Sequence, residues 1–284
     1  MKDIFIKGLI SYNTSTCMFF KLFIIIVGGG MLVVSCSLFE YHPYETNVSD
    51  KNRNVNAKAI ERILSSVPPS KDTLVIIHTG DSQRFYDEVE DFVKSANKQN
   101  ADFVFLAGDI SDFGLKDEFE WIHEIMRKLK IPYLGVIGNH DLSGNGETVF
   151  KKVYGPLNSS FIVNRFKFIL LNTNSREYRF NGRVPDIHWL EEQLDDDDFD
   201  RAIVVSHISP FDGSFDRKLE QGYVTALENS GKVNLSLHAH QHKFNDTIPY
   251  HDNIRYLIST AMQERMYLLI KLYGDKYSYE KIYY

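Results

Sequence analysis

The stretch Phe103-Val104-Phe105-Leu106-Ala107-Gly108-Asp109 decides the fold. Its run of apolar residues predicts a strand buried on both faces, and a glycine and a carboxylate follow where the strand ends. Similar apolar runs lie on either side of it in the chain, at 74–77 and 133–137. Between the runs, apolar residues recur at helical spacing over 84–98 and 116–129. This alternation predicts an α/β fold with mostly parallel strands covered by helices.

The second half of the chain continues the α/β pattern with different connections. Asn164-Arg165 predicts a turn between two paired strands, and Gly274-Asp275 predicts the turn of a hairpin near the C-terminus. Between these turns, the pattern predicts helices and strands that alternate, with helices at 187–194 and 215–229 and strands at 202–206 and 233–237.

The composition favours a single globular domain and disfavours a nucleic-acid binder. The 284 residues are 43% hydrophobic and 25% charged, which supplies enough apolar material for a sizeable core. The formal net charge is -6 and no basic run is present, whereas a nonspecific nucleic-acid binder usually carries a basic face. Both cysteines, Cys17 and Cys36, lie near the N-terminus, so a metal site in the body must use oxygen and nitrogen ligands.

The N-terminal region has the features of an export signal. An apolar run at 22–34 follows Lys21 and has the length of a signal-peptide core rather than of a membrane span. The run ends in Val33-Val34-Ser35-Cys36, which resembles the bacterial lipobox and implies lipid attachment to the cysteine. An uncleaved anchor or a lipid-free signal peptide is the alternative. In each of these cases the folded domain is exported.

We therefore expect three regions in the chain. A signal peptide occupies 1–35, with Met18 as an alternative start. A lipidated cysteine and a tether occupy 36–70, and the folded domain occupies 71–284. This organisation predicts an exported bacterial lipoprotein that is anchored to the membrane through Cys36, in the periplasm or at the cell surface.

Polar side chains that bind metals follow five of the apolar runs. They occur in Gly80-Asp81-Ser82-Gln83, Gly108-Asp109-Ile110-Ser111-Asp112, Gly138-Asn139-His140-Asp141, Ser206-His207 and His238-Ala239-His240. Ligand-binding groups of a parallel sheet belong at the carboxyl ends of its strands. The shared position of these groups predicts a binuclear metal centre, because a fold has no structural need for this set of polar residues.

In this order, the motifs resemble those of the calcineurin-like metallophosphoesterases: Asp-x-His, Gly-Asp, Gly-Asn-His, a later His, and Gly-His-x-His. The resemblance covers roughly residues 73–261. It implies an α/β four-layer α-β-β-α sandwich of two mixed β-sheets flanked by helices. It also implies two divalent metal ions at the strand ends, with Mn, Fe or Zn as the suited metals and Mg as a further candidate.

The resemblance assigns a role to each matching residue. Asp81, Gln83 and His240 bind the first metal, Asp109 bridges both, and Asn139, His207 and His238 bind the second. His140 and Asp109 are the catalytic residues, and Asn139 and His140 contact the substrate. The chain departs from the family pattern at Gln83, which replaces a histidine and favours Mn or Mg in the first site, and at Leu237, which replaces a glycine.

The implied reaction is hydrolysis of a phosphate monoester or diester by a hydroxide that bridges the metals. A phosphorylated small molecule or a lipid is the expected substrate, with pyrophosphates also open, and nucleic acid is disfavoured by the acidic charge and the export signal. The alternatives are a degenerate metal-binding scaffold without turnover and a nuclease-like phosphodiesterase. The sequence leaves the oligomeric state open.

Several other polar residues near the motifs receive a more modest interpretation. We expect His78 to end a strand, Asp112 to orient its loop, Asp141 to orient His140 or a ligand, and His242 to lie beside the site. His123 and His188 lie in helical patterns and are expected to be partly packed or exposed. The loops beside the site also carry cations suited to a second phosphate, namely Arg176, Arg179, Arg183, Arg217 and Lys243.

Overall fold

The computed structural model describes residues 42, 44–251 and 253–284. The chain divides into two units, Met1–Glu45 and a compact unit, Thr46–Tyr284, which contains every helix and strand described below. The predicted signal peptide, the lipobox and Cys36 lie outside the described residues. None of the helices in the described ranges is long and apolar enough to cross a membrane.

The first sheet has five strands in the order β11-β10-β1-β2-β3. Its parallel part consists of β1 (Thr73–Thr79), β2 (Phe103–Ala107) and β3 (Tyr133–Val136). The antiparallel strands β10 (Met266–Tyr273) and β11 (Lys276–Tyr283) extend it as a hairpin through the predicted turn at Gly274. The sheet is therefore mixed, as expected.

The second sheet has six strands in the order β4-β5-β6-β7-β9-β8. The hairpin of β4 (Ser159–Val163) and β5 (Phe166–Leu171) turns at Asn164 and Arg165, whose φ angles are 47° and 65°. The parallel strands that follow are β6 (Arg201–Ser206), β7 (Val233–His238) and β9 (Arg255–Ile258), and β8 (Asn245–Thr247) pairs antiparallel with β9.

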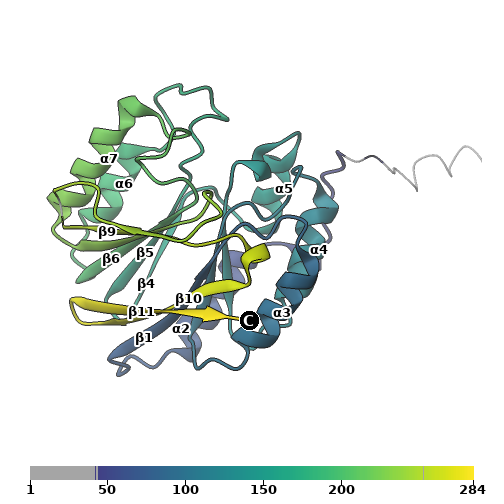
Figure 1. Ribbon diagram of the computed structural model, residues 1–284, viewed down its shortest axis with the longest axis horizontal. Helices are drawn as coiled ribbons and strands as arrows, with labels where there is room; N and C mark the ends of the chain where they lie inside the picture. Colours follow the sequence, from purple (N-terminus) through teal and green to yellow (C-terminus); the bar gives the residue numbers. More distant parts are fainter. Residues whose placement is uncertain (1–41, 43, 252) are drawn as a thin grey trace, which may run out of the picture. The chain divides into compact units, whose positions relative to one another are not determined.

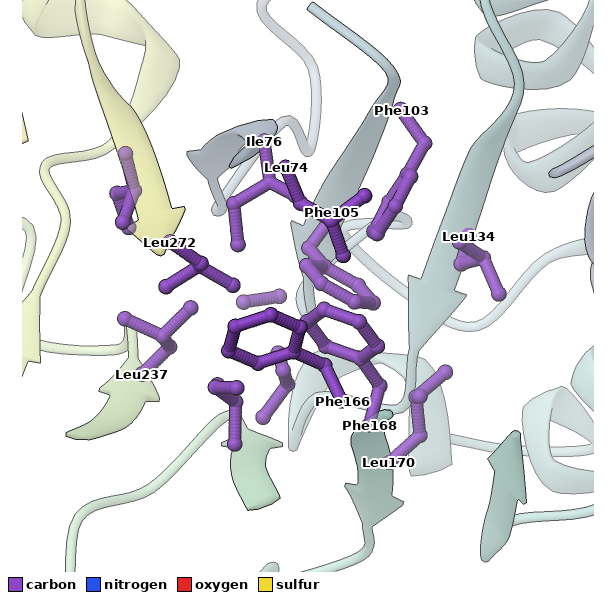
Figure 2. Packing of buried hydrophobic residues seen from close by; sticks show 14 of the residues in the cluster. Leu74, Ile76, Phe103, Phe105, Leu134, Phe166, Phe168, Leu170, Leu237 and Leu272 are labelled. Carbon is purple, nitrogen blue, oxygen red and sulfur yellow. The ribbon is translucent and has the colours of Figure 1, made fainter. Parts of the chain in front are cut away.

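The inner faces of the two sheets pack against each other to form the central core. Phe103 and Phe105 of β2 meet Phe168 of β5 with ring centroids 5.2 and 5.4 Å apart (Figure 2). Leu237 of β7 and Leu272 of β10 belong to the same buried cluster. Side chains point alternately to opposite faces of a strand. One set therefore packs between the two sheets, and the other set packs between a sheet and its helices.

Helices cover both outer faces, which completes the four layers (Figure 1). The helices α3 (Tyr86–Ala96), α4 (Lys116–Met126) and α5 (Gly146–Val153) pack on the first sheet. The helices α6 (Ile187–Leu194) and α7 (Arg217–Ser230) pack on the second. Short 3-10 turns, η1 (Asp50–Asn52), η2 (His140–Leu142) and η3 (Met262–Glu264), complete the described helices.

The boundary expected at residue 70 places too much of the chain in the tether. A helix, α2 (Val55–Ser66), lies before it and buries Ala59 and Ile63 in the central core. Asn56 of α2 also exchanges two hydrogen bonds with the backbone of Gly135 in the edge strand β3, at 2.8 and 2.9 Å. The helix thus caps an exposed strand edge, and the folded unit begins at Thr46 rather than at residue 71.

Candidate metal centre

The carboxyl ends of five strands bring together all of the predicted ligand residues except His238, and they add His242. The residues that meet there are Asp81 and Gln83 after β1, Asp109 after β2, Asn139 after β3, His207 after β6, and His240 and His242 after β7. Five of these have positive φ angles, namely Asp81 at 51°, Gln83 at 34°, Asp109 at 51°, His240 at 73° and His242 at 58°. Such backbone conformations are costly for non-glycine residues and concentrate at functional sites.

His207 lies at the centre of the group and is fully buried. Its Nδ1 lies 2.8 Å from the carbonyl of Ala107, to which it can donate only if the proton is on that nitrogen. Its Nε2 faces Asn139 Oδ1 at 3.1 Å, Asp109 Oδ2 at 3.3 Å and His240 Nδ1 at 3.2 Å. Acceptor atoms that converge in this way need a shared cation or a proton between them.

A second group of polar side chains also includes Asp109. Asp81 Oδ1 is buried without a hydrogen bond of good geometry, 3.2 Å from His242 Nε2. Gln83 lies beside it, with its side-chain amide 3.4 Å from Asp109 Oδ2. The ligand atoms of Asp81, Asp109 and His242 lie within 4.8 Å of one another, as do those of Asp109, His207 and His240. Two groups that share one carboxylate fit a pair of metal ions.

The charges of the group support the same interpretation. Burial acts to raise the pKa of the Asp109 carboxyl, but the adjacent His207 lowers it below its usual range. Burial acts to lower the pKa of His207, and Asp109 raises it well above its usual value. A positive charge is therefore stabilised beside this buried carboxylate, where a metal ion would supply it.

Two glycines allow the close approach of the ligands. A Cβ atom on Gly108 would lie 2.5 Å from His207 Nδ1, and its φ of 88° is itself unfavourable for other residues. A Cβ atom on Gly138 would lie 2.0 Å from the backbone nitrogen of Asp109. A larger residue at either of these two positions would therefore collide with a proposed ligand residue.

The structure does not bring His238 into the group, and the expectation that it is a ligand needs correction. It is the last residue of β7, where it shares the outward face with Ser236. Its two ring nitrogens lie 3.0 Å from Ser206 Oγ and 2.9 Å from Ser236 Oγ, and its ring stacks on Tyr256. The side chain is therefore committed to the layer between the second sheet and its helices.

His242 takes the place that the motif alignment gave to His240, and His240 takes that of His238. The family pattern Gly-His-x-His thus corresponds to Ala239-His240-Gln241-His242, and the departure from glycine is at Ala239 rather than Leu237. Ala239 packs tightly on Gly80, since a Cβ atom there would lie 2.5 Å from the Cβ of Ala239. The small residue before a His-x-His pair was the signal that favoured this alignment.

His140 lies beside the group with its side chain 41% exposed. Its backbone N–H donates to Asp109 Oδ1 at 2.9 Å, and its Nδ1 lies 2.8 Å from the carbonyl oxygen of Asp112. The carboxylate of Asp112 is paired with Arg84 at 3.1 Å. Because Nδ1 is held by a carbonyl, it carries a proton, and Nε2 is left available on the open side.

Of the two roles expected for Asp141, its contacts do not fit orientation of His140 but fit orientation of the segments that carry Asp109 and Asn139. Its carboxylate accepts hydrogen bonds from the backbone N–H and hydroxyl of Ser111 at 2.7 and 2.8 Å, and from Gly138 N–H at 2.8 Å. It therefore ties the loop after β2 to the loop after β3. His78 is also turned away, since its Nε2 lies 2.8 Å from the carbonyl of His238. His188 is exposed and His123 is partly packed, as expected.

Asp212 is a neighbour of the group that sequence reasoning missed. Its Oδ1 lies 3.7 Å from His240 Nε2, and its Oδ2 accepts from Gln241 Nε2 at 3.3 Å. It thus lies on the far side of the ring whose Nδ1 faces the group, which is the position of a carboxylate that orients a metal-binding histidine. No local pattern marks it, because it lies in an irregular loop after Phe211.

The four-layer sandwich and the two acceptor groups that share a carboxylate define a class of binuclear metal hydrolases. The model of the family "Calcineurin-like phosphoesterase" matches residues 74–244, and the chain belongs to this family. It is therefore a hydrolase that acts on phosphoric ester bonds and depends on metal ions.

Two curated relatives share part of the sequence. A protein of Moraxella catarrhalis named "Probable cyclic nucleotide phosphodiesterase" is 24% identical over 196 residues, which is 62% of this chain and 70% of the relative. A protein of Arcobacter nitrofigilis named "Probable glycerophosphodiester phosphodiesterase" is 26% identical over 119 residues, which is 40% of this chain and 44% of the relative.

Solved structures share the fold at low identity. A dimetal phosphatase from Danio rerio has a TM-score of 0.58 and 11% identity, with 74% of this chain and 99% of that chain covered. A purple acid phosphatase from yellow lupin seeds has a TM-score of 0.58 and 12% identity, with 76% of this chain and 52% of that chain covered. These similarities confirm the expected sandwich.

Proposed function

We propose that the protein hydrolyses a small organic phosphodiester at a binuclear centre around Asp109. The proposed ligands of the first metal are Asp81, Gln83, Asp109 and His242, and those of the second are Asp109, Asn139, His207 and His240. The observation that carries this proposal is that two groups of possible ligand atoms share the buried carboxylate of Asp109. It replaces His238 with His242 in the ligand set that the sequence suggested.

The metal ions, His140 and Asn139 would each have a different role in the reaction. When bound, two divalent ions would neutralise charge on the phosphoryl group and lower the pKa of water to near 7. His140 would contact the phosphoryl group or leaving oxygen through Nε2 and exchange a proton there, since its Nδ1 is held by the carbonyl of Asp112. Asn139 would contribute its amide oxygen to a metal and lie next to the substrate.

The names of the two curated relatives favour a diester over a monoester, because both are named as phosphodiesterases. The oxygen-rich first site favours Mn or Mg, since the amide oxygen of Gln83 replaces an imidazole. A nuclease-like activity is the competing substrate class, and the acidic net charge of -6 weighs against it.

We further propose that the enzyme works outside the cytoplasm on a lipid anchor at Cys36. The apolar run at 22–34 and the sequence Val33-Val34-Ser35-Cys36 support this location. Replacing the cysteine (Cys36→Ser) should move the protein from the membrane fraction to the soluble fraction of the producing cell. Retention of the variant in the membrane would argue for an uncleaved anchor.

The test of the activity uses the chain from residue 37 onward, which contains the whole compact unit. After reconstitution with Mn, we expect faster hydrolysis of bis(p-nitrophenyl) phosphate than of p-nitrophenyl phosphate, and loss of both activities with a chelator. A single-stranded oligonucleotide serves as the nuclease arm. A preference for the monoester or for the oligonucleotide would overturn the proposed substrate class.

A further inference from the structure

The loop between β5 and α6, residues 172–186, begins beside the proposed metal centre. Thr173 Oγ1 accepts a hydrogen bond from the backbone N–H of Ile208 at 3.0 Å, directly after His207. Asn174 donates from its side chain to the carbonyl of Ile137 at 3.0 Å, two residues before Asn139. Both residues are buried. The start of the loop is thus fixed between two segments that carry proposed ligands.

The rest of the loop is held in a defined shape by polar contacts. Phe180 N–H donates to the carbonyl of Ser175 at 3.0 Å, which closes a tight turn. The hydroxyl of Ser175 donates to the carbonyl of Val184 at 2.6 Å, and Tyr178 donates to Glu147 of α5 at 2.8 Å. The loop therefore presents its remaining side chains from a frame tied to its neighbours.

Among the described residues, three arginines of this frame form no hydrogen bond or ion pair through their guanidinium groups. Arg176, Arg179 and Arg183 are exposed, and within the described part of the chain they take part in no side-chain hydrogen bond or ion pair. Arg217, another cation that the sequence suggested, is already paired with Glu220 at 2.6 Å. A loop that starts beside the proposed ligands thus carries unpaired positive charge, although the chain as a whole has a formal charge of -6.

Electrostatic contact with the centre reaches this part of the loop. Partial burial raises the pKa of the Glu177 carboxyl, the neighbouring Arg176 lowers it, and Asp109 of the proposed centre raises it further. Arg176 is the first cation of the loop and lies three residues beyond the anchored Thr173.

We propose that Arg176, supported by Arg179 and Arg183, binds a second phosphate group on the part of the substrate that is not cleaved. The planar guanidinium group pairs with phosphate through two parallel hydrogen bonds, and an arginine without a competing carboxylate bond is available for this contact. The inference rests on the proposed function and narrows it to diesters that carry another phosphate.

Two chromogenic diesters that differ only in this group provide the test. One is thymidine 5'-(p-nitrophenyl phosphate), and the other carries an additional 3'-phosphate. We expect the Mn-loaded enzyme to prefer the second by about tenfold or more in kcat/KM. Arg176→Gln should remove most of that preference through KM, with kcat nearly unchanged. Arg127→Gln, which removes an equal charge from the exposed end of α4, should keep it.

The outcomes separate this inference from the proposed function. Equal hydrolysis of both diesters by the unaltered enzyme would overturn the inference while the phosphodiesterase activity stands. The same holds if the preference survives both in Arg176→Gln and in a variant that combines Arg176→Gln, Arg179→Gln and Arg183→Gln. If neither diester is cleaved, the proposed phosphodiesterase function is contradicted for these substrates. Calorimetry with thymidine 3',5'-bisphosphate against thymidine 5'-monophosphate then decides, since equal binding overturns the inference and an Arg176-dependent preference supports it.

Discussion

His140 is the proposed catalytic residue whose ring is both held in place and open to solvent. Its Nδ1 is bound by the Asp112 carbonyl, so its Nε2 is free for the leaving oxygen. We expect His140→Ala to lower kcat by about 10²- to 10⁴-fold, the usual contribution of general acid catalysis. The metal content should stay the same, because only the backbone of His140 contacts Asp109. Loss of metal from the variant would contradict this role and identify the residue as a ligand.

His238 and His242 form a matched pair that tests the corrected ligand set. We expect His242→Ala to lose about one metal ion per chain, because its Nε2 faces the unpartnered oxygen of Asp81. His238→Ala should keep both ions but unfold at a lower temperature, since it leaves Ser206 and Ser236 without their buried partner. Elemental analysis and thermal unfolding measure the two effects. The opposite pattern of metal loss would restore the alignment suggested by the sequence.

Helix α4 carries a histidine that couples folding to pH far from the proposed centre. His123 Nδ1 lies 2.6 Å from the hydroxyl of Tyr133, and burial lowers the pKa of His123 to about 4. Nearby Glu124 acts to raise this pKa, whereas Arg127 and Lys58 lower it further. In the unfolded chain, the ring titrates near 6.5. Between these values the unfolded state binds the proton more readily, so lowering the pH through this range favours unfolding.

We therefore expect the free energy of unfolding to fall as the pH is lowered from about 6.5 to about 4, more steeply in the wild type than in His123→Gln. Glutamine keeps an acceptor for the Tyr133 hydroxyl but does not titrate. Denaturant unfolding at several pH values measures both slopes, and the carboxyl groups contribute equally to the two proteins. Parallel slopes would show that His123 is solvated and titrates normally.

At the scale of the whole molecule, α2 belongs to the folded unit although it lies before the first strand. We expect a chain that begins at Thr46 to unfold at the same temperature as one that begins at residue 37. A chain that begins at Lys71 should be less stable by several kcal/mol, because Ala59, Ile63 and Val67 leave the core at about 1–2 kcal/mol each. Calorimetric unfolding of the three chains tests this. Equal stability of the shortest chain would show that residues 46–70 are a tether after all.

The sandwich was predictable because each layer has a local sequence signal. The apolar run of β2 and the helical spacing in α3 and α4 follow from which faces must be buried. The turns at Asn164-Arg165 and Gly274-Asp275 were also visible in the chain. In α2, Val55, Ala59 and Ile63 are at helical spacing. Nothing in the local sequence shows that this helix packs against a sheet edge, so the sequence predicts a tether through residue 70.

The sequence by itself determined the fold class, the family and most of the candidate centre, because glycines and polar residues that follow apolar strands meet at one edge of a parallel sheet. Only the tertiary structure decided which histidines of His238-Ala239-His240-Gln241-His242 enter the centre. The physical reason is that β7 continues through His238, so pairing with its neighbours turns that side chain outward. The free arginines of the loop at 172–186 and the position of Asp212 likewise depend on contacts between segments far apart in the chain.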